Sequence, residues 1–269
     1  MLIRAGYEIT FDCIRPTPML LMLSTHPSRH ADLRSPELMR FDPMVASHFY
    51  RDGFGNVCAR ILAPAGRITI ASDFTVEDGG EPDALAPGAR QAPVDQLPDD
   101  VLVYLLNSRY CEVDLLLDTA WSLFGDVEPG WARVQAICQH VHDRITFGYA
   151  HARNTRTARE AYIEQRGVCR DFAHLALALC RCMNIPARYC TGYLGDIGVP
   201  LSDTPMDFSG WFDVYLDGRW ITCDARHNKP RIGRILMARG RDATDVAITT
   251  QFDYAALIGF TVITDEVTP

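Results

Sequence analysis

The amino-acid sequence predicts an α+β fold, with an N-terminal antiparallel β domain followed by a core of helices packed on an antiparallel sheet. The first 76 residues contain short runs rich in β-branched and aromatic residues, interrupted by Pro, Gly and Asp. After about residue 100, apolar residues recur at helical spacing, and strand-like runs return after residue 186. Helices followed by antiparallel strands are typical of α+β proteins.

The predicted β domain spans residues 1–80. Its strand-like runs are "LIRAGYEITFDC", "PMLLMLSTHP", "SHFYRDGFGNVCARILAPAG" and "RITIASDFTVED", and "RDGFGN" is expected to be a turn between two strands. Residues 81–100 are rich in Pro and Gly and are predicted to form a linker. The core domain is then expected to span residues 101–269.

Four helical regions are predicted in the first half of the core. Residues 98–125 form helical segments that end near Gly125, and residues 128–149 contain a second helix with apolar residues at helical spacing. Thr157 is a candidate N-cap of a short helix ending at Gly167. The next helix, "VCRDFAHLALALCRCMNIP", is nearly all apolar and should be buried.

Composition excludes several classes of protein. The 269 residues are 48% hydrophobic and 22% charged, which argues against disorder. A net charge of −8 argues against a nucleic-acid partner, although residues 226–241 form a local basic cluster. The sequence contains no apolar run of membrane-spanning length and no N-terminal signal-peptide pattern, so no membrane association and a cytoplasmic location are expected. The oligomeric state is left open.

Cysteine and glycine patterns predict no cofactor and no metal. The nine cysteines lack the spacing of a disulfide scaffold and are expected to be reduced and mostly buried. The group Cys180, Cys182 and Cys190 lacks the spacing of a zinc site. No glycine-rich phosphate-binding loop follows a predicted strand.

A β-hairpin is predicted around the turn Asp217-Gly218, which places Leu216 opposite Arg219. Because side chains alternate along a strand, apolar and polar groups separate onto two faces. The apolar face carries Phe208, Phe212, Val214, Leu216, Ile221 and Cys223. The polar face carries Ser209, Trp211, Asp213, Asp224 and Arg226. Ser209 and Asp224 are therefore predicted to be diagonal neighbours, with backbones about 7–8 Å apart.

Cys169 opens the buried helix and is a candidate nucleophile. Unpaired N–H groups and the helix dipole at a helix N-terminus stabilise a thiolate, so we expect a lowered pKa for Cys169. The same N–H groups could form an oxyanion hole for acyl transfer. The alternative is that Cys169 is one more buried structural cysteine.

These residues resemble the transglutaminase-like superfamily of papain-like cysteine enzymes. The resemblance covers residues 105–228 and rests on "RGVCRDFAHLALALCRCMNIPARYCTGY" followed by "DFSGWFDVYLDGRWITCDAR". It implies a transglutaminase-like, papain-like core, preceded by the β region found in bacterial members. It also implies that Cys169 is the nucleophile and that Asp224 is the acid that orients the base.

The chain departs from the family at the base. Members typically read His-Ala-Trp where this chain reads Ser209-Gly210-Trp211, and a serine cannot accept a thiol proton near neutral pH. His227 is the candidate substitute base; the hairpin register places it on the apolar face, but the strand is ending there.

A base could also be dispensable if nearby cations ionise the thiol, which would favour thioesters over amides. Arg226 and Arg170 are the candidate cations, and they are also predicted to contact substrate together with Trp211. A salt bridge between Arg226 and Asp224 is the alternative role for that arginine.

The sequence therefore predicts a thiol enzyme that forms an acyl-enzyme on Cys169. Its chemistry would be amide or thioester hydrolysis, or acyl transfer to an amine. Its substrate would be a peptide, a protein or an acyl thioester. The alternative is a catalytically degenerate protein, marked by Ser209, that binds a peptide or a protein partner.

Overall fold

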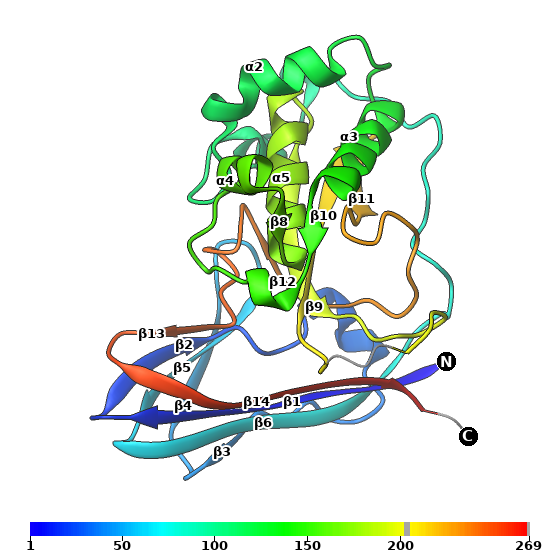
Figure 1. The fold of residues 1–269 in the computed structure, drawn as a ribbon. Coiled ribbons are helices and arrows are strands. Elements are labelled where there is room, and N and C mark those ends of the chain that lie inside the picture. Colours follow the sequence, from blue (N-terminus) through cyan, green and yellow to red (C-terminus); the bar gives the residue numbers. More distant parts are fainter. Residues whose placement is uncertain (202–204, 268–269) are drawn as a thin grey trace.

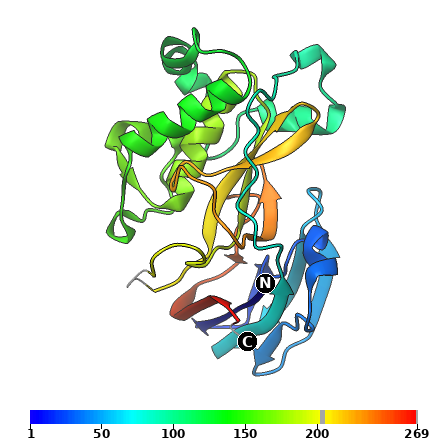
Figure 2. The ribbon, with the colours of Figure 1, turned by 90° about the vertical axis from the view of Figure 1, so that its right-hand side faces the viewer.

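A computed structural model describes residues 1–201 and 205–267. Helices pack on one antiparallel sheet in the upper part of the molecule, and two further four-stranded sheets lie below it (Figure 1). The view turned by 90° shows the hairpin of the upper sheet standing above the lower strands (Figure 2). The predicted α+β class is confirmed.

The lower part contains two four-stranded antiparallel sheets. The first has the order β14-β1-β6-β3. Its strands are β14 (Ala255–Glu266), β1 (Leu2–Cys13), β6 (Gly66–Glu77) and β3 (Arg40–Asp42). The second has the order β13-β2-β5-β4. Its strands are β13 (Thr249–Gln251), β2 (Thr17–Leu21), β5 (Val57–Ala63) and β4 (Ser47–Arg51).

Strand alternation explains the core of this lower part. Alternate residues of β6, such as Ile68, Ile70 and Phe74, are buried, while their neighbours face outward. A short 3-10 helix, η1 (Pro27–Asp32), follows β2. The sequence expected a strand over residues 18–27, but strand β2 ends at Leu21 and the following residues lead into η1.

The last strand of the chain, β14, pairs with the N-terminal sheet, whereas the sequence predicts that all of residues 101–269 belong to the core. β14 pairs with β1 from Ile3↔Glu266 to Cys13↔Ala255, with one irregularity between Thr10 and Phe11. Residues 255–266 therefore extend the β region formed by the first 77 residues. The sequence signals for a strand were correct, but they carry no information on which sheet a strand joins.

The upper part forms the helical core. Its sheet has the order β11-β10-β9-β12, and α5 packs on β9 and β10. The strands are β9 (Ala187–Tyr193), β10 (Ser209–Leu216), β11 (Arg219–Cys223) and β12 (Ile235–Gly240). The helices are α1 (Asp99–Leu102), α2 (Val113–Phe124), α3 (Trp131–Arg144), α4 (Ala158–Glu164) and α5 (Cys169–Cys182). The short elements are η2 (Val94–Gln96), η3 (Val103–Leu105), β7 (Thr146–Phe147), η4 (Tyr149–His151) and β8 (Arg166–Gly167).

Local signals set the helix ends. Thr157 caps α4 through a reciprocal capping box with Glu160, as its position predicted. α4 ends at Glu164, before the predicted end at Gly167, because Gln165 adopts the left-handed conformation that terminates a helix. α5 is buried on nearly all sides, as its apolar sequence predicted.

Residues 78–98 connect the two parts as an ordered segment that lies against the core. Ala86 and Ala89 are buried in the core cluster, and the carbonyl of Ala89 accepts a hydrogen bond from the N–H of Trp131 at 2.9 Å. We call residues 78–98 the connector. No helix among the described residues is both long enough and apolar enough to cross a membrane.

Candidate active site

Cys169 is the first residue of α5, and its side chain is half-buried. All nine cysteines are free, and the other eight are buried. Burial raises the pKa of the Cys169 thiol, and the Arg226 guanidinium and the Gly210 N–H oppose that shift without reversing it. The expected lowered pKa is therefore wrong, and this thiol needs a partner to take its proton.

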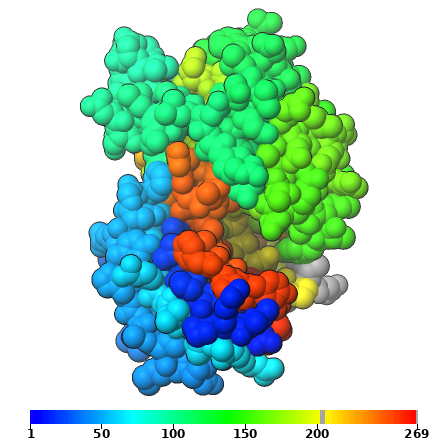
Figure 3. All heavy atoms as spheres, turned by 90° about the vertical axis from the view of Figure 1, so that its left-hand side faces the viewer, coloured from blue at the N-terminus to red at the C-terminus, as the bar shows by residue number. Residues whose placement is uncertain are grey.

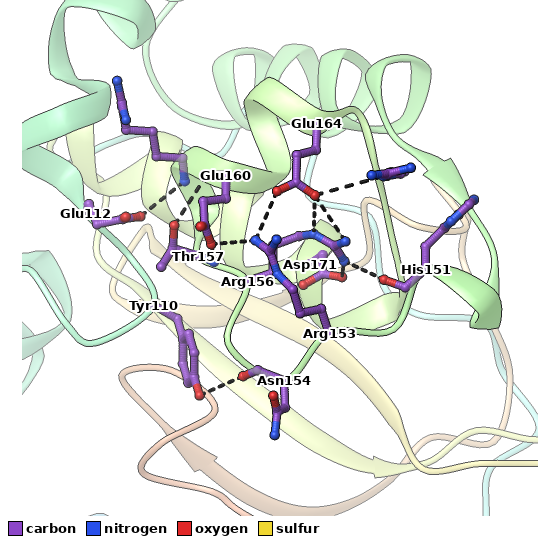
Figure 4. A network of polar contacts seen from close by, with 12 residues as sticks. Tyr110, Glu112, His151, Arg153, Asn154, Arg156, Thr157, Glu160, Glu164 and Asp171 are labelled. Carbon is purple, nitrogen blue, oxygen red and sulfur yellow. Dashed lines mark hydrogen bonds and ion pairs between the residues drawn. The ribbon is translucent and has the colours of Figure 1, made fainter.

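Asp171 fixes the helix end that carries Cys169. Its Oδ2 accepts a hydrogen bond from the Val168 N–H at 2.9 Å and from Arg156 Nη1 at 2.9 Å. Arg156 also donates to the His151 carbonyl at 2.7 Å and to Glu164. Figure 4 shows Arg156 between the two carboxylates and the loop before α4. This buried network holds the loop beside the candidate nucleophile.

The hairpin register predicted from the sequence is confirmed from Phe212↔Cys223 to Leu216↔Arg219. β11 ends at Cys223, and the chain then turns around Asp224. Asp224 Oδ1 accepts the N–H groups of Arg226 at 3.0 Å and His227 at 3.1 Å, which folds the chain back on the carboxylate. This turn, which strand alternation does not describe, brings the His227 side chain to Asp224.

His227 is oriented by Asp224. His227 Nδ1 lies 2.8 Å from Asp224 Oδ2. Burial acts to raise the pKa of Asp224, but hydrogen bonds and charge from His227 and Arg234 outweigh it and hold the pKa well below its usual range. Because an ionised carboxylate only accepts hydrogen bonds, Nδ1 donates to it, and Nε2 is the ring nitrogen of His227 that can accept a proton.

Ser209 lines a cavity with Cys169 and another with His227. Cys169 lines one cavity of about 540 Å³. His227 lines a second cavity of about 570 Å³. Asp207, Phe208 and Ser209 line both. Within the described part of the chain, the buried Ser209 Oγ has no hydrogen-bond partner.

Gly210, the second departure from the family motif, is explained by Tyr189. An added Cβ at Gly210 would lie 2.3 Å from the Tyr189 hydroxyl oxygen, so the alanine of the family motif would require the Tyr189 side chain to move. Tyr189 also lines the Cys169 cavity. The change to glycine is therefore tied to a side chain that forms the wall of the site.

The two cavities differ in character. The Cys169 cavity has a largely apolar far wall. This wall includes Phe208, Ala243, Val246, Ala247, Ile248 and Phe260. Figure 3 shows a hollow between the C-terminal segment, coloured orange to red, and the green part of the chain above it. The His227 cavity is charged and contains Asp196, Asp207, Arg226, Arg231, Asp265 and Glu266.

The predicted substrate-contacting residues have different positions. Arg170 lines the Cys169 cavity and donates to the carbonyl of Asn154 at 3.1 Å. Arg226 lines the His227 cavity, with its guanidinium 3.8 Å from the centre of the Phe147 ring. Trp211 lines a separate cavity of about 270 Å³. Trp211 lies two residues further along β10 than Ser209, the first residue of that strand.

The predicted salt bridge of Asp224 with Arg226 is replaced by one with Arg234, at 2.7 Å. Within the basic cluster of residues 226–241, the side chains of Arg231 and Arg234 are buried, whereas Lys229 is exposed and Arg241 is partly exposed. Sequence reasoning missed Arg234 because β12 and the turn before it gave no recognisable motif.

It also missed His142, whose Nδ1 lies 2.9 Å from the Arg226 carbonyl and so donates to it. This contact ties α3 to the turn that carries His227. The only signal for it was the helical position of His142, which is equally compatible with a solvent-exposed residue.

Comparison with known proteins identifies related sequences. Residues 120–225 match the family model of the transglutaminase-like superfamily. The chain is 27% identical over 230 residues to an uncharacterised protein of Mycobacterium leprae, covering 76% of this chain and 75% of the relative. It is 26% identical over 216 residues to an uncharacterised protein of Mycobacterium tuberculosis, covering 73% of this chain and 68% of the relative.

The fold also resembles a solved structure along its whole length. A candidate cysteine protease from Cytophaga hutchinsonii, known from a crystal structure at 1.9 Å, superposes with a TM-score of 0.83. The two proteins are 27% identical, and the match covers 100% of this chain and 93% of the other. These comparisons confirm the resemblance that the cysteine and hairpin motifs predicted.

Proposed function

We propose that this chain, whose residues 120–225 form a transglutaminase-like domain, is a thiol enzyme with Cys169 as nucleophile and His227 as base. The observation that carries the proposal is the 2.8 Å contact between His227 Nδ1 and the ionised Asp224. His227 also lines a cavity with Ser209, which stands where the family motif has histidine. Asp224 thus orients a histidine from the following turn in place of one at position 209. The raised pKa of Cys169 makes such a base necessary.

Ser209 supplies the connection between base and nucleophile. Its buried hydroxyl has no hydrogen-bond partner among the described residues, so the relay forms only when substrate binding brings Cys169, Ser209 and His227 within hydrogen-bond distance. The hydroxyl then accepts the thiol proton while it donates its own proton to His227 Nε2. The resulting thiolate attacks the acyl carbon, and the first N–H groups of α5 stabilise the oxyanion. Protonated His227 returns the proton to the leaving group, which leaves a thioester on Cys169. Water or an amine then attacks this thioester, giving its proton to His227.

The two cavities indicate which part of a substrate binds on each side of the site. The acyl part occupies the apolar cavity beside Cys169, and the leaving group or acceptor occupies the charged cavity beside His227. Proton transfer to the leaving group is needed on the His227 side, so this orientation matches the chemistry. The resemblance to a candidate cysteine protease supports a peptide or protein as acyl donor.

The alternative is a degenerate protein that uses the same cavities for binding. Two observations favour it: serine at position 209, and burial that keeps the Cys169 thiol protonated. In that case the apolar cavity would hold a peptide side chain without covalent chemistry.

An acylation experiment separates the two. The protein is incubated with a 3-phenylpropionyl thioester and with the matched 4-nitroanilide, and adducts are mapped by mass spectrometry. We expect a phenylpropionyl adduct on Cys169 that disappears in Cys169→Ala. In His227→Gln, the acylation rate should fall by about 100-fold, the lower end of general-base effects.

His48→Gln is the matched histidine control, because His48 lies exposed on β4 in the lower part of the molecule. Its acylation rate should equal that of the unmodified chain. Absence of an adduct on Cys169 with either acyl donor, combined with binding of apolar peptides, would support the binding protein instead.

A further inference from the structure

Asp224 shares one oxygen between two partners. Its Oδ2 contacts His227 Nδ1 at 2.8 Å and Arg234 Nη2 at 2.7 Å. Arg234 is always charged at physiological pH, so it competes with a protonated His227 for the same carboxylate. Taken alone, Arg234 would disfavour the protonated imidazole that catalysis has to form.

The connector supplies the charge that compensates Arg234. Asp83 contacts Arg234 Nε through both carboxylate oxygens, at 3.0 and 2.8 Å. Backbone hydrogen bonds fix its position, because the Asp83 N–H donates to the Arg231 carbonyl at 2.8 Å and Asp83 Oδ2 accepts from the Arg231 N–H at 3.0 Å. Asp83 is therefore held by hydrogen bonds in a fixed position beside Arg234.

Burial makes this charge arrangement effective. The side chains of Arg234 and Asp224 are only 8% and 4% exposed, and that of Asp83 is 17% exposed. Burial alone would lower the pKa of Arg234, yet Asp224 and Asp83 together raise it. Interactions between such charges are poorly screened by solvent.

We infer that Asp83 is a positioning residue of the active site, which acts through Arg234 to keep the charge of Asp224 available to His227. With Asp83 ionised, the cluster of Asp83, Arg234 and Asp224 is net negative and favours protonation of His227. Without that charge the cluster is neutral, and His227 is a weaker base. The inference rests on the proposed role of His227, and it assigns a chemical function to the connector.

Other titratable and charged groups face His227 and remain constant in the comparison. They come from η4, the loop after β9, the segment before β10, the turn after β11 and strand β14. They are Tyr149, Asp196, Asp207, Arg226, Arg231, Asp265 and Glu266. Because none is altered in the variants below, the shifts measured between variants report the Asp83–Arg234 contact.

The test is an NMR titration of the His227 imidazole in the Cys169→Ala background, which needs no enzymatic activity. Asp83→Asn keeps the shape and one acceptor but removes the charge, so the His227 midpoint should fall by about half a pH unit. Arg234→Gln removes the competing cation, so the midpoint should rise. The double variant should lie between the two single variants.

Asp78→Asn is the matched control. Asp78 lines the same cavity of about 270 Å³ as Asp83, but it pairs with Arg29 at 3.3 Å and not with Arg234. It should leave the His227 midpoint unchanged. An unchanged midpoint in Asp83→Asn, or shifts of the same sign in Asp83→Asn and Arg234→Gln, would overturn the inference. Neither result depends on whether Cys169 forms an acyl-enzyme, so this inference and the proposed function can fail separately.

Discussion

The proposed chemistry depends most on Ser209. It stands where the family motif has histidine, it is buried, and it lines the cavities of both Cys169 and His227. A serine in this position cannot act as a base, but a hydroxyl can pass a proton between two partners. Position 209 is therefore where a substitution tests the route of the proton most directly.

Replacing Ser209 should change acylation in two directions. Ser209→Ala removes the hydroxyl that we propose carries the proton between Cys169 and His227, so acylation by the thioester should fall about 10-fold or more. Ser209→His places a base beside the thiol, so acylation should rise and should persist in Ser209→His/His227→Gln. Stopped-flow or quenched mass spectrometry of Cys169 measures both rates. If Ser209→Ala acylates at the rate of the unmodified chain, the hydroxyl is not on the proton path.

Some residues of the site could be predicted from the sequence and others could not. The place of Cys169 at a helix start and the hairpin register as far as Cys223 follow from local signals, and the structure confirms both. Asp224 lies just beyond the paired strands, in the turn that follows β11. Strand alternation, when it is extended past Cys223, predicts that His227 lies on the apolar face, and this prediction fails because β11 ends at Cys223. The Asp224 side chain itself forms the turn that moves His227, and such a turn depends on a side-chain contact rather than on a repeating pattern.

At the scale of elements, α5 and its cap determine where the nucleophile lies. The apolar sequence of α5 predicted a buried helix, and its bounds agree. The cap could not be predicted, because Arg156 comes from the loop before α4 and reaches Asp171 from 15 residues away. A side chain at Gly167 would disturb the same cap, because an added Cβ there would lie 2.5 Å from Asp171 Oδ2.

Removal of this cap should destabilise the helix start. Asp171→Ala loses the acceptor of the Val168 N–H and leaves one side of buried Arg156 unpaired, so the free energy of unfolding should fall by roughly 3 kcal/mol. Urea unfolding followed by circular dichroism measures the loss. Asp118→Ala, an exposed position on α2, should change stability by less than about 0.5 kcal/mol. Equal effects of the two substitutions would contradict the role of the cap.

At the scale of the whole molecule, β14 closes the chain on itself by pairing with β1. The same strand contributes Phe260 to the apolar cavity and Asp265 and Glu266 to the charged one. The lower sheets therefore help to build the candidate site. Strand pairing across so much of the sequence was beyond prediction, because a strand's pattern of alternating residues specifies its two faces but not its neighbour.

Burial lowers the pKa of three histidines in the described chain, and the effect is large at His26 and His174 and smaller at His140. Burial, followed by the charge of Arg239, lowers the pKa of His26 to about 4. Burial also lowers the pKa of His174 to about 3, against an opposing effect of Asp242. His26 lies where the lower part meets β12, with its N–H donating to the Leu236 carbonyl at 2.9 Å, and His174 lies inside α5. Protonation of either histidine would therefore loosen a different part of the fold.

Stability should consequently decrease as the pH falls below about 6.5, the ordinary pKa of histidine. Between that pH and about 4, an unfolded chain binds protons on both histidines while the folded chain does not, so each lowers the free energy of unfolding by about 1.4 kcal/mol per pH unit. Urea unfolding at pH 7.5, 6 and 5 measures this slope. His26→Gln and His174→Gln should each make the slope shallower, whereas His48→Gln, at an exposed site on β4, should leave it unchanged. A stability that stays constant from pH 7.5 to 5 would mean that both histidines gain protons without unfolding the chain, and that neither is held neutral by its surroundings.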